Sequence, residues 1–325
     1  MELFSNNTAE TIAHVGELGL IQSMRTWLGE ASPPAPGGIG DDCAVIKRSN
    51  TDNQLLTTDC VAYKRHFDTS AAPEAVGAKL IKRNLSDIAA MGGTPGPALL
   101  ALLAGGDLKI EWLQKFYEGI AQAALRYGTR LVGGDICESD PGSFCATLTL
   151  LGEAQHPVPR CAAKEGDTLW VTGTLGGSIL GHHLTFEPRL AEGHWLAQTG
   201  FAHAMIDITD GLAKDIPTLF PSGMCASLDL TAIPLSEAAH ALARTSGKTP
   251  LEHAFCDGED YELCFALDQE AEVTAFRNAW ENTFSTPLTL IGTVEEKTTD
   301  APLVDQSTGA PLTKWHGFTW LHETR

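Results

Sequence analysis

The stretch Ile39-Gly40-Asp41-Asp42-Cys43-Ala44-Val45 places two adjacent carboxylates between a glycine-rich turn and an apolar run. Two unit charges about 4 Å apart repel by roughly 4 kcal/mol at an effective dielectric constant near 20. A chain tolerates this repulsion when a cation lies between the acids or when water screens them. Acids recur at four more junctions of this kind, in Thr57-Thr58-Asp59, Asn84-Leu85-Ser86-Asp87, Gly133-Gly134-Asp135 and Asp207-Ile208-Thr209-Asp210. We expect these acids to converge on divalent metals that hold the phosphates of a nucleotide.

The length and charge of the chain limit the classes of protein to which it can belong. Its 325 residues suffice for a full core and for about two domains. Hydrophobic residues make up 43% and charged residues 19%, which is typical of a globular protein. The net charge of -19 argues against binding a nucleic-acid backbone, because that affinity comes mainly from Lys and Arg. A nucleotide would also be repelled unless Mg²⁺ intervened.

The cysteines and the N-terminal sequence predict a cytoplasmic, soluble chain. The eight cysteines form no C-x-x-C pair and show no zinc spacing, so we interpret them as small buried residues in a reducing compartment. The sequence begins without a basic region followed by a long apolar run, so no signal peptide is expected. No apolar run reaches the roughly 20 residues that a membrane-spanning helix needs.

Hydrophobic periodicity and turn residues predict strands paired around two helices in the first half of the chain. A short extension, 1–15, precedes a helix that begins at residue 17. Thr69 or Ser70 is expected to cap the helix that follows the second strand. The predicted strands are 43–46, 55–61, 97–104, 129–132 (ending in Gly133-Gly134-Asp135) and 143–152, and the predicted helices are 73–91 and 110–127.

The second half repeats the mixture of strands and helices without an obvious internal sequence match. A plausible linker, 155–160, separates the halves. We therefore predict an N-terminal extension 1–15, an N-terminal domain 16–153 and a C-terminal domain 154–325. The predicted strands are 167–172, 204–208, 225–230 and 288–294, the predicted helices are 211–220, 236–244 and 269–280, a glycine-containing turn within 255–267 leads into another strand, and the tail is coil-like.

Common nucleotide-binding signatures are absent. There is no G-x-x-x-x-G-K-[ST] loop and therefore no candidate for its phosphate-binding lysine. The H-R-D and D-F-G motifs of protein kinases are also missing. Acid-rich junctions without such a lysine indicate a site in which Mg²⁺ supplies the positive charge, held by one or two carboxylates, water and substrate phosphates.

Taken together and in order, the motifs point to one family. Besides the acidic junctions, these motifs are His66-Phe67, the whole stretch from Asn84 to Gly92, and Gly258-Glu259-Asp260-Tyr261-Glu262-Leu263. The chain resembles the thiamine-monophosphate kinase family over roughly residues 16 to 320. This family belongs to the superfamily of aminoimidazole ribonucleotide synthetase, selenophosphate synthetase and a hydrogenase-maturation protein. No single motif would be specific, but the ordered set is.

The resemblance implies an α+β fold of two domains. The N-terminal domain carries a mixed, largely antiparallel sheet with helices and dimerises into a barrel-like interface, and the C-terminal domain is an α/β sandwich. The resemblance also implies a homodimer that uses ATP and several Mg²⁺ ions. The magnesium ligands it implies are Asp42, Thr57, Thr58, Asp59, Asp87, Asp135, Asp207 and Asp210.

The remaining residues that the resemblance implies contact the nucleotide or the second substrate. Nucleotide contacts fall on Gly134, Asp135, Arg160 and Thr209. Substrate contacts fall on His66, Trp315 and Glu259, with the neighbouring Asp260 as a competitor for the role of Glu259. For each position the alternative is an ordinary structural role, such as a solvated loop acid, a surface arginine or a packed tryptophan.

The implied reaction transfers the γ-phosphoryl group of ATP to thiamine monophosphate, yielding thiamine diphosphate and ADP. We expect direct in-line transfer without a side-chain acid or base, because the acceptor is already an anionic phosphate oxygen. A tryptophan can hold the cationic thiazolium ring by stacking, worth about 0.5–2 kcal/mol. Two alternatives remain open, namely another ATP-dependent enzyme of the superfamily (such as a purine-precursor ligase) and a non-catalytic protein that binds Mg-nucleotide.

The chain departs from the family pattern at several positions. Lys64-Arg65 stand where the family usually has glycine and a variable residue, and Gly177 replaces a common aspartate. Asp257 replaces the first glycine of the usual Gly-Gly-Glu-Asp. Thr209 replaces the more frequent serine and keeps the hydroxyl group.

Overall fold

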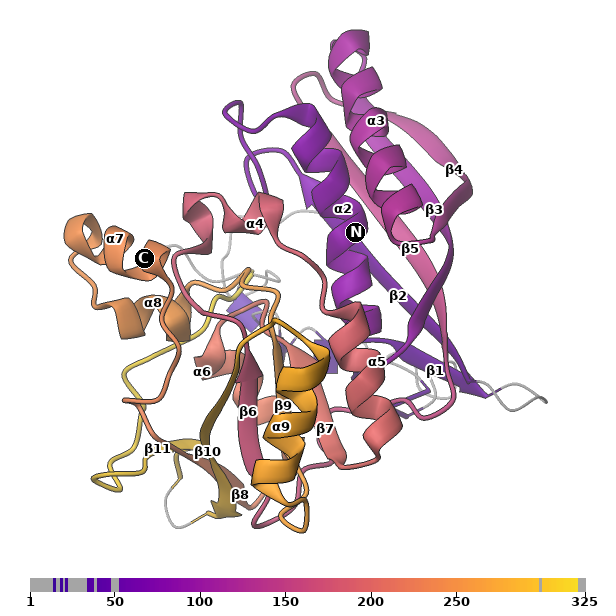
Figure 1. Cartoon of the computed structure of the whole chain (residues 1–325). Helices are drawn as coiled ribbons and strands as arrows, with labels where there is room; N and C mark the ends of the chain where they lie inside the picture. The colour runs from indigo at the N-terminus through magenta and orange to yellow at the C-terminus, as the bar shows by residue number, and fades with distance from the viewer. Residues whose placement is uncertain are drawn as a thin grey trace.

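The structure is a computed structural model that describes residues 14–15, 18–19, 21–22, 34–37, 40–47, 53–297 and 300–320. Two β-sheets, each packed against helices, make up the described chain (Figure 1). The predicted mixed α+β class is therefore confirmed. The predicted extension 1–15 and the helix expected from residue 17 lie mostly outside the described residues.

The first sheet contains five strands in the order β1-β2-β5-β3-β4. All neighbours are antiparallel except β3 and β4, which run parallel. Helices α2 and α3 lie together along one face of this sheet (Figure 1). The bounds are β1 Ala44–Lys47, β2 Asn53–Ala62, β3 Thr94–Gly105, β4 Arg130–Ser139, β5 Phe144–Ala154, α2 Pro73–Ala90 and α3 Ile110–Arg126.

The other face of the first sheet is open. Along β3, Leu100 and Leu102 are buried against the helices, whereas Leu99 and Leu103 are 46% and 42% exposed. Successive side chains of a strand point to opposite faces, so an all-apolar strand presents leucines on both. On the edge strand β4, Val132 is 64% exposed, and Ile136, which pairs with Leu102 on the helix side of the sheet, is 77% exposed. This sheet thus carries an uncovered apolar surface.

The second sheet contains six strands in the order β11-β8-β10-β6-β9-β7 and has helices on both faces. Leu169 and Val171 of β6 pack toward one face, whereas Trp170 packs toward α5 and α9 on the other. The strand bounds are β6 Thr168–Thr172, β7 Ala202–Asp207, β8 Met224–Leu228, β9 Leu263–Leu267, β10 Leu288–Glu296 and β11 Leu303–Asp305. The helix bounds are η3 Ser178–Leu180, α4 His182–Thr185, α5 Leu190–Thr199, α6 Leu212–Asp215, η4 Ile216–Leu219, α7 Glu237–Ser246, α8 Pro250–Cys256 and α9 Val273–Thr283.

Helix α2 joins the two halves of the molecule. Its N-terminal part packs on the first sheet through Leu80, whereas Ala89 and Ala90 belong to the hydrophobic cluster of the second half, together with Leu196 of α5. The last turn of α2, including Asp87, is thereby held at the junction. The first sheet uses strands between residues 44 and 154 and the second uses strands between 168 and 305. The domain division at 153/154 itself stays a prediction.

Several local predictions were wrong. The N-cap of α2 is Ala72, whose side chain makes no capping hydrogen bond, so neither Thr69 nor Ser70 caps this helix. Gly133-Gly134-Asp135 does not end a strand but lies in the middle of β4. Helices α5 and α8 and strand β11 were not predicted, because their patterns are short or irregular. The predicted helix 211–220 is broken into α6 and the 3₁₀ turn η4.

Among the described residues, no helix combines the length and the apolar character needed to cross a lipid bilayer.

The contact between α2 and α3 depends on two glycines. A Cβ atom on Gly119 would lie 2.0 Å from the carbonyl oxygen of Glu74, and one on Gly77 would lie 2.0 Å from that of Phe116. The two helix backbones therefore approach each other more closely than any side chain would allow.

Replacing Gly119 with alanine should lower the free energy of unfolding by about 1–3 kcal/mol, because overpacking at this contact outweighs the better helix propensity of alanine. Gln122→Ala, at an exposed position of the same helix, should stay within about 0.5 kcal/mol of the wild type. Urea denaturation followed by circular dichroism measures both. Equal stability of the two variants would show that the helices are not in close contact.

Candidate active site

A cavity of about 760 Å³ lies between the two halves of the chain. Its volume falls in the range typical of small-molecule sites. Polar and charged side chains from both halves form much of its wall. The predicted site residues that line it are Asp42, Thr57, Thr58, Asp59, His66, Asp87, Arg160, Asp207, Thr209, Asp210 and Glu259.

Three carboxylates meet at one point of this wall. Asp42 precedes β1, Asp87 lies in the last turn of α2, and Asp207 is the last residue of β7; one oxygen of each lies within 4.8 Å of the others. The hydroxyl groups of Thr57 and Ser86 donate hydrogen bonds to Asp87 and Asp207, respectively. Among the described residues, Oδ1 of Asp207 is buried without a hydrogen-bond partner. Such a set of hard oxygen atoms fits a divalent cation.

The electrostatics of the cluster agree with its geometry. Burial, followed by the charges on Asp207, Asp59 and Asp42, raises the pKa of Asp87 well above its ordinary value of 3.8. Burial and then the charge on Asp42 raise the pKa of Asp207 in the same way. Perturbed acids that share a cleft are typical of functional sites. Without a cation, burial and the neighbouring charges therefore disfavour the ionised forms of Asp87 and Asp207.

Arg160 holds the adjacent acids Asp41 and Asp42. Its Nε atom lies 2.7 Å from Oδ2 of Asp42, and its Nη2 atom contacts Oδ1 of the same carboxylate. The backbone N–H of Arg160 donates to Asp41 at 3.1 Å. Burial, reinforced by Asp42, still raises the pKa of Asp41 to about 6. A guanidinium group thus supplies part of the cationic charge that the Asp-Asp pair requires.

Strand β2 divides its predicted ligands between its two faces. Thr57 points into the junction, where it bonds to Asp87. The side chain of Thr58, next along the strand, instead bonds to the carbonyl oxygen of Leu148 on β5 at 3.0 Å. Only the backbone of Thr58 is then available to the cavity, since side chains alternate along a strand.

Two basic residues of α2 that sequence reasoning missed organise the opposite wall. Nη2 of Arg83 lies 2.9 Å from Asp59, and the fully buried Nζ of Lys79 lies 2.6 Å from Glu259. Burial disfavours the charged form of Glu259, but Lys79 outweighs it and lowers the pKa of this carboxyl group. A signal was available in the sequence, because residues 79, 83 and 87 repeat every four positions and so share one face of the helix.

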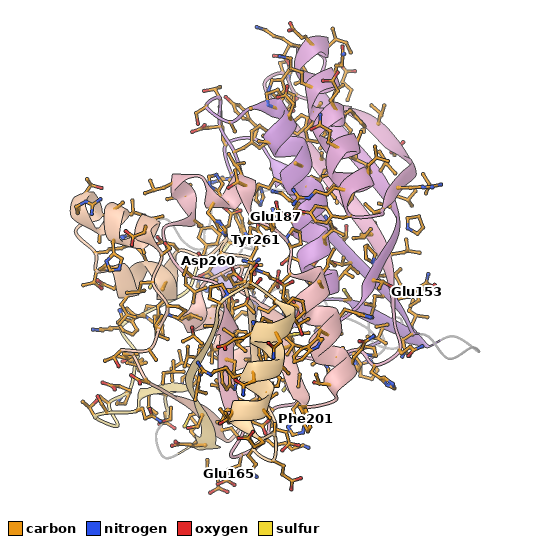
Figure 2. All side chains as sticks on the ribbon, in the orientation of Figure 1. Glu153, Glu165, Glu187, Phe201, Asp260 and Tyr261 are labelled. Carbon is orange, nitrogen blue, oxygen red and sulfur yellow. The ribbon has the colours of Figure 1, made fainter. Side chains whose placement is uncertain are left out.

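The loop before β9 is strained in a way that fixes Glu259. Glu259 and Tyr261 have φ angles of 56° and 53°, a left-handed region that non-glycine residues rarely adopt. Their N–H groups donate to the carbonyl oxygens of Thr209 and Ile208, each at 2.8 Å. Between them, Asp260 is 1% exposed and accepts a hydrogen bond from the N–H of Gly176 (Asp260 and Tyr261 are labelled in Figure 2). Asp260 therefore supports the loop, and Glu259 faces the cavity.

The loop after β7 depends on a further acid that sequence reasoning missed. Oδ2 of the buried Asp215 accepts hydrogen bonds from the N–H groups of Thr209 and Asp210, both at 3.0 Å. Burial is the main reason that the pKa of Asp215 rises to about 8. The side chain of Asp210 pairs with Lys214 at 2.7 Å. Asp215 thus folds the loop that presents Asp210.

The aromatic wall of the cavity differs from the prediction. Trp315 is 7% exposed and packs in the core of the second half, with its ring centroid 4.3 Å from that of Phe255. Trp320 lines the cavity instead, with its ring centroid 5.1 Å from that of His66. Burial lowers the pKa of His66 to about 3, and its Nδ1 atom accepts a hydrogen bond from the N–H of Ala62. His66 is therefore a neutral ring in this wall.

Gly134 and Asp135 are not brought to this cavity. They lie on the edge strand β4, beside a separate hollow of about 570 Å³. A Cβ atom on Gly134 would lie 1.8 Å from the carbonyl oxygen of Leu100 on β3, so close strand approach alone requires glycine there. Asp135 is exposed.

The chain is similar to known proteins at two levels, the superfamily and the family. Residues 40–154 match the model of the AIR synthase related protein N-terminal domain. The chain is also similar in fold to the hydrogenase-maturation protein HypE of Escherichia coli, with a TM-score of 0.63 at 18% identity over 93% of this chain and 97% of the other. The fold is therefore that of the AIR synthase-like superfamily, as the motifs predicted.

The more similar relatives are kinases. The thiamine-monophosphate kinase of Rhodopirellula baltica is 40% identical over 275 residues, which cover 82% of this chain and 85% of the relative. A solved structure described as AaThiL complexed with AMPPCP and TMP superimposes with a TM-score of 0.80 at 30% identity, covering 94% of this chain and 97% of the other. The chain belongs to the thiamine-monophosphate kinase family.

The acids of the cavity should differ in their effect on stability. Asp207→Asn removes a carboxyl group whose ionisation is opposed by burial and by Asp42, so it should raise the free energy of unfolding of the metal-free protein at pH 8 by about 1–3 kcal/mol. Asp59→Asn leaves Arg83 without its carboxylate partner and should lower the free energy of unfolding by about 3–5 kcal/mol. Denaturation in buffer with chelator measures both. If both substitutions changed the free energy of unfolding equally and in the same direction, the expected difference between Asp207 and Asp59 would be contradicted.

The sign of the pH dependence follows from the raised pKa values. Asp87 and Asp207 bind protons in the folded protein that they release when unfolded, so the metal-free protein should lose stability as pH rises from about 4. Asp207→Asn should reduce the dependence of the free energy of unfolding on pH, as measured by denaturation at several pH values. Asp140→Asn, at an exposed position, should leave this dependence unchanged.

Proposed function

We propose that this chain transfers the γ-phosphoryl group of ATP to the phosphate of thiamine monophosphate, forming thiamine diphosphate and ADP. The observation that carries the proposal is the single cavity on which nearly all of the predicted ligands converge from both halves of the chain. The choice of substrates rests on the names of the relatives and on the solved relative described with AMPPCP and TMP.

The residues of the cluster fit magnesium. Asp42, Asp87 and Asp207 offer oxygen atoms within 4.8 Å of one another, and one buried oxygen of Asp207 has no hydrogen-bond partner among the described residues. Asp59, Thr57 and the backbone of Thr58 reach the same cavity from β2, and Asp210 reaches it from the loop after β7. When bound, Mg²⁺ would neutralise the phosphates that a chain of net charge -19 otherwise repels.

Positioning is the chemical contribution of the protein. The acceptor is a phosphate oxygen that is already anionic, so no side chain has to remove a proton from it. We assign no acid or base role in this phosphoryl transfer to any residue of the cavity. Arg160 and Thr209 are proposed to hold the nucleotide, and the rigid loops around Asp215 and Tyr261 keep the walls fixed while the reacting groups align.

The wall formed by His66, Glu259 and Trp320 is proposed to hold thiamine monophosphate. A carboxylate and an aromatic ring both attract the cationic thiazolium ring, and the ring contact is worth about 0.5–2 kcal/mol. Trp320 takes the stacking role expected of Trp315, because Trp315 packs in the core. Lys79 orients Glu259 from behind.

A homodimer would give a role to the open face of the first sheet. Leu99 and Leu103 leave an apolar surface uncovered there, and such surfaces are typical of interaction sites. Gly134 and Asp135 lie on the same edge strand, away from the cavity of their own chain. Their proposed nucleotide and metal contacts therefore require a second chain, whose cavity they would help to complete.

The kinase proposal is tested by incubating the protein with ATP, Mg²⁺ and thiamine monophosphate and separating the thiamine phosphates by chromatography. Thiamine diphosphate should form in step with ADP. Asp87→Asn should reduce turnover by at least about 100-fold, while Asp140→Asn should leave it unchanged. Formation of ADP without thiamine diphosphate would instead support another superfamily activity, and nucleotide binding without any turnover would support a non-catalytic role.

The dimer proposal is tested by the molar mass in solution. Leu103→Lys places a charge on the open sheet face and should convert a dimer into a monomer as measured by light scattering. Leu125→Lys, at a position on α3 that is 79% exposed, is the matched control and should remain dimeric. A monomeric wild type at micromolar concentration would reject the proposal.

A further inference from the structure

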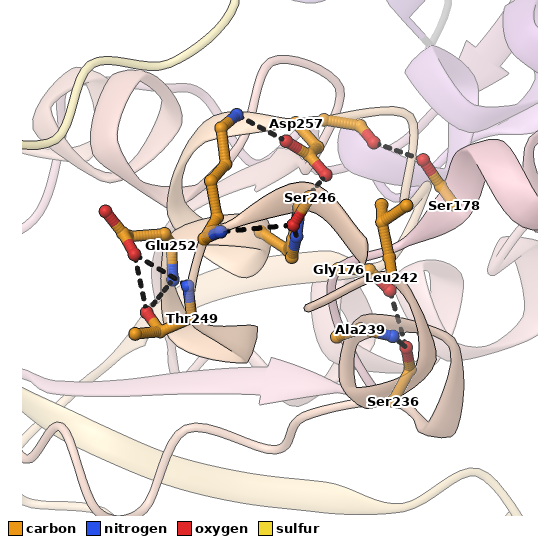
Figure 3. Close-up of polar contacts among 12 residues, drawn as sticks. Gly176, Ser178, Ser236, Ala239, Leu242, Ser246, Thr249, Glu252 and Asp257 are labelled. Atoms are coloured by element: carbon orange, nitrogen blue, oxygen red, sulfur yellow. Dashed lines mark hydrogen bonds and ion pairs between the residues drawn. The ribbon is translucent and has the colours of Figure 1, made fainter. Parts of the chain in front are cut away.

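Three residues outside the predicted ligand set form a hydrogen-bonded chain on one wall of the cavity. Oγ of Ser246 lies 2.8 Å from Nε2 of His253, and Nδ1 of His253 lies 2.6 Å from Oδ2 of Asp257. All three residues line the cavity. Figure 3 shows the polar contacts around Ser246 and Asp257. A hydroxyl group, an imidazole and a carboxylate in this order form the constellation of nucleophilic serine enzymes.

The chemistry of the three groups sets the direction of each hydrogen bond. An ionised carboxylate only accepts, so His253 donates its Nδ1–H to Asp257. In the tautomer with the proton on Nδ1, the lone pair of the ring lies on Nε2, where it accepts the hydroxyl proton of Ser246. His253 is 2% exposed and cannot easily turn away from either partner. The arrangement therefore points a general base at the Ser246 hydroxyl group.

Local structure fixes this geometry. Ser246 is the last residue of α7, and a capping box between Thr249 and Glu252 begins α8 three residues later. His253 and Asp257 follow with a spacing of four residues, which places them on the same side of the helix. Nζ of Lys248 lies 3.5 Å from Oδ1 of Asp257, and the N–H of Lys248 donates to Oγ of Ser246 at 3.2 Å.

This chain of residues is not explained by the kinase reaction. Phosphoryl transfer to a phosphate oxygen needs no general base, and none of the three residues belongs to the predicted ligand set. Apolar side chains lie on the same cavity wall: Ile179 is 60% exposed, Phe318 is 38% exposed, and Leu242 belongs to the same helix as Ser246. The surroundings of the hydroxyl group thus suit a small apolar acyl group.

We propose that Ser246 is the nucleophile of a second, hydrolytic activity of this protein toward short-chain carboxylic esters, with His253 as its base and Asp257 as the positioning residue. Oγ of Ser246 attacks the ester carbonyl carbon while its proton passes to Nε2 of His253. The bond from the carbonyl carbon to the alkoxy oxygen breaks, and the alcohol leaves with the proton from His253. Water then attacks the acyl-serine, its proton passes through His253 to Oγ, and the carboxylic acid is released.

This activity is separate from the proposed kinase function and requires no nucleotide. The test uses the full chain in metal-free buffer with a fluorophosphonate probe, which forms a phosphorus–oxygen bond to an activated serine and releases fluoride. Intact mass and peptide mapping should find one adduct, on Ser246, and p-nitrophenyl butyrate should be hydrolysed. Ser246→Ala should abolish both, and Asp257→Asn and His253→Asn should slow labelling by about 100-fold or more.

Ser178 provides a matched control in the same cavity. Its hydroxyl group donates to the carbonyl oxygen of Gly258 at 2.6 Å and has no basic partner among the residues that the structure describes, so Ser178→Ala should leave labelling of Ser246 unchanged. Because His253 is buried, melting curves establish that its variant is folded, and the partly exposed Asp257 gives an independent variant. An unlabelled Ser246, or equal labelling rates in the wild type and in folded Asp257→Asn, would overturn the proposal whether or not the kinase reaction is observed.

Discussion

The mutual repulsion of buried carboxylates is the constraint on which the rest of this molecule depends. Asp42, Asp87 and Asp207 arrive from three separate elements and place oxygen atoms within 4.8 Å of one another. The protein relieves part of the repulsion itself, through Arg160 on Asp42 and hydroxyl groups on the other two acids. What remains is a deficit of positive charge at the base of a large cavity, which suits divalent cations and the phosphates that accompany them.

The fold supplies the rigidity that such a cluster needs. Helix α2 packs against both halves, so the turn that carries Asp87 cannot move independently of the strand that carries Asp207. The strained loop at Glu259 and the Asp215 hydrogen bonds fix the remaining walls. Basic residues contribute locally rather than through net charge: Lys79, Arg83 and Arg160 each hold one acid in a defined orientation, which leaves the more crowded acids for metal.

The sequence predicted the strands and helices of the first half closely, because their hydrophobic periodicity is long and regular. It also predicted the members of the acid cluster, since each of these acids stands where a junction rich in glycine, serine or threonine meets a strand or helix. The irregular second half was harder: α5 and α8 carry weak patterns, and Trp315 looks like a ligand residue in sequence but packs in the core. Partnerships such as Arg83 with Asp59 depend on tertiary contacts that no single segment encodes, and a strand position such as Asp135 acquires meaning only from its neighbours in space.

The central claim is that the three converging acids bind a divalent cation, and anomalous scattering tests it most directly. Crystals grown with Mn²⁺ and a non-hydrolysable ATP analogue should show an anomalous peak within coordination distance of Asp42, Asp87 and Asp207. A peak at that position that is absent from crystals of Asp207→Asn would agree with the account. Crystals of the wild type with nucleotide bound but no metal among these three side chains would contradict it.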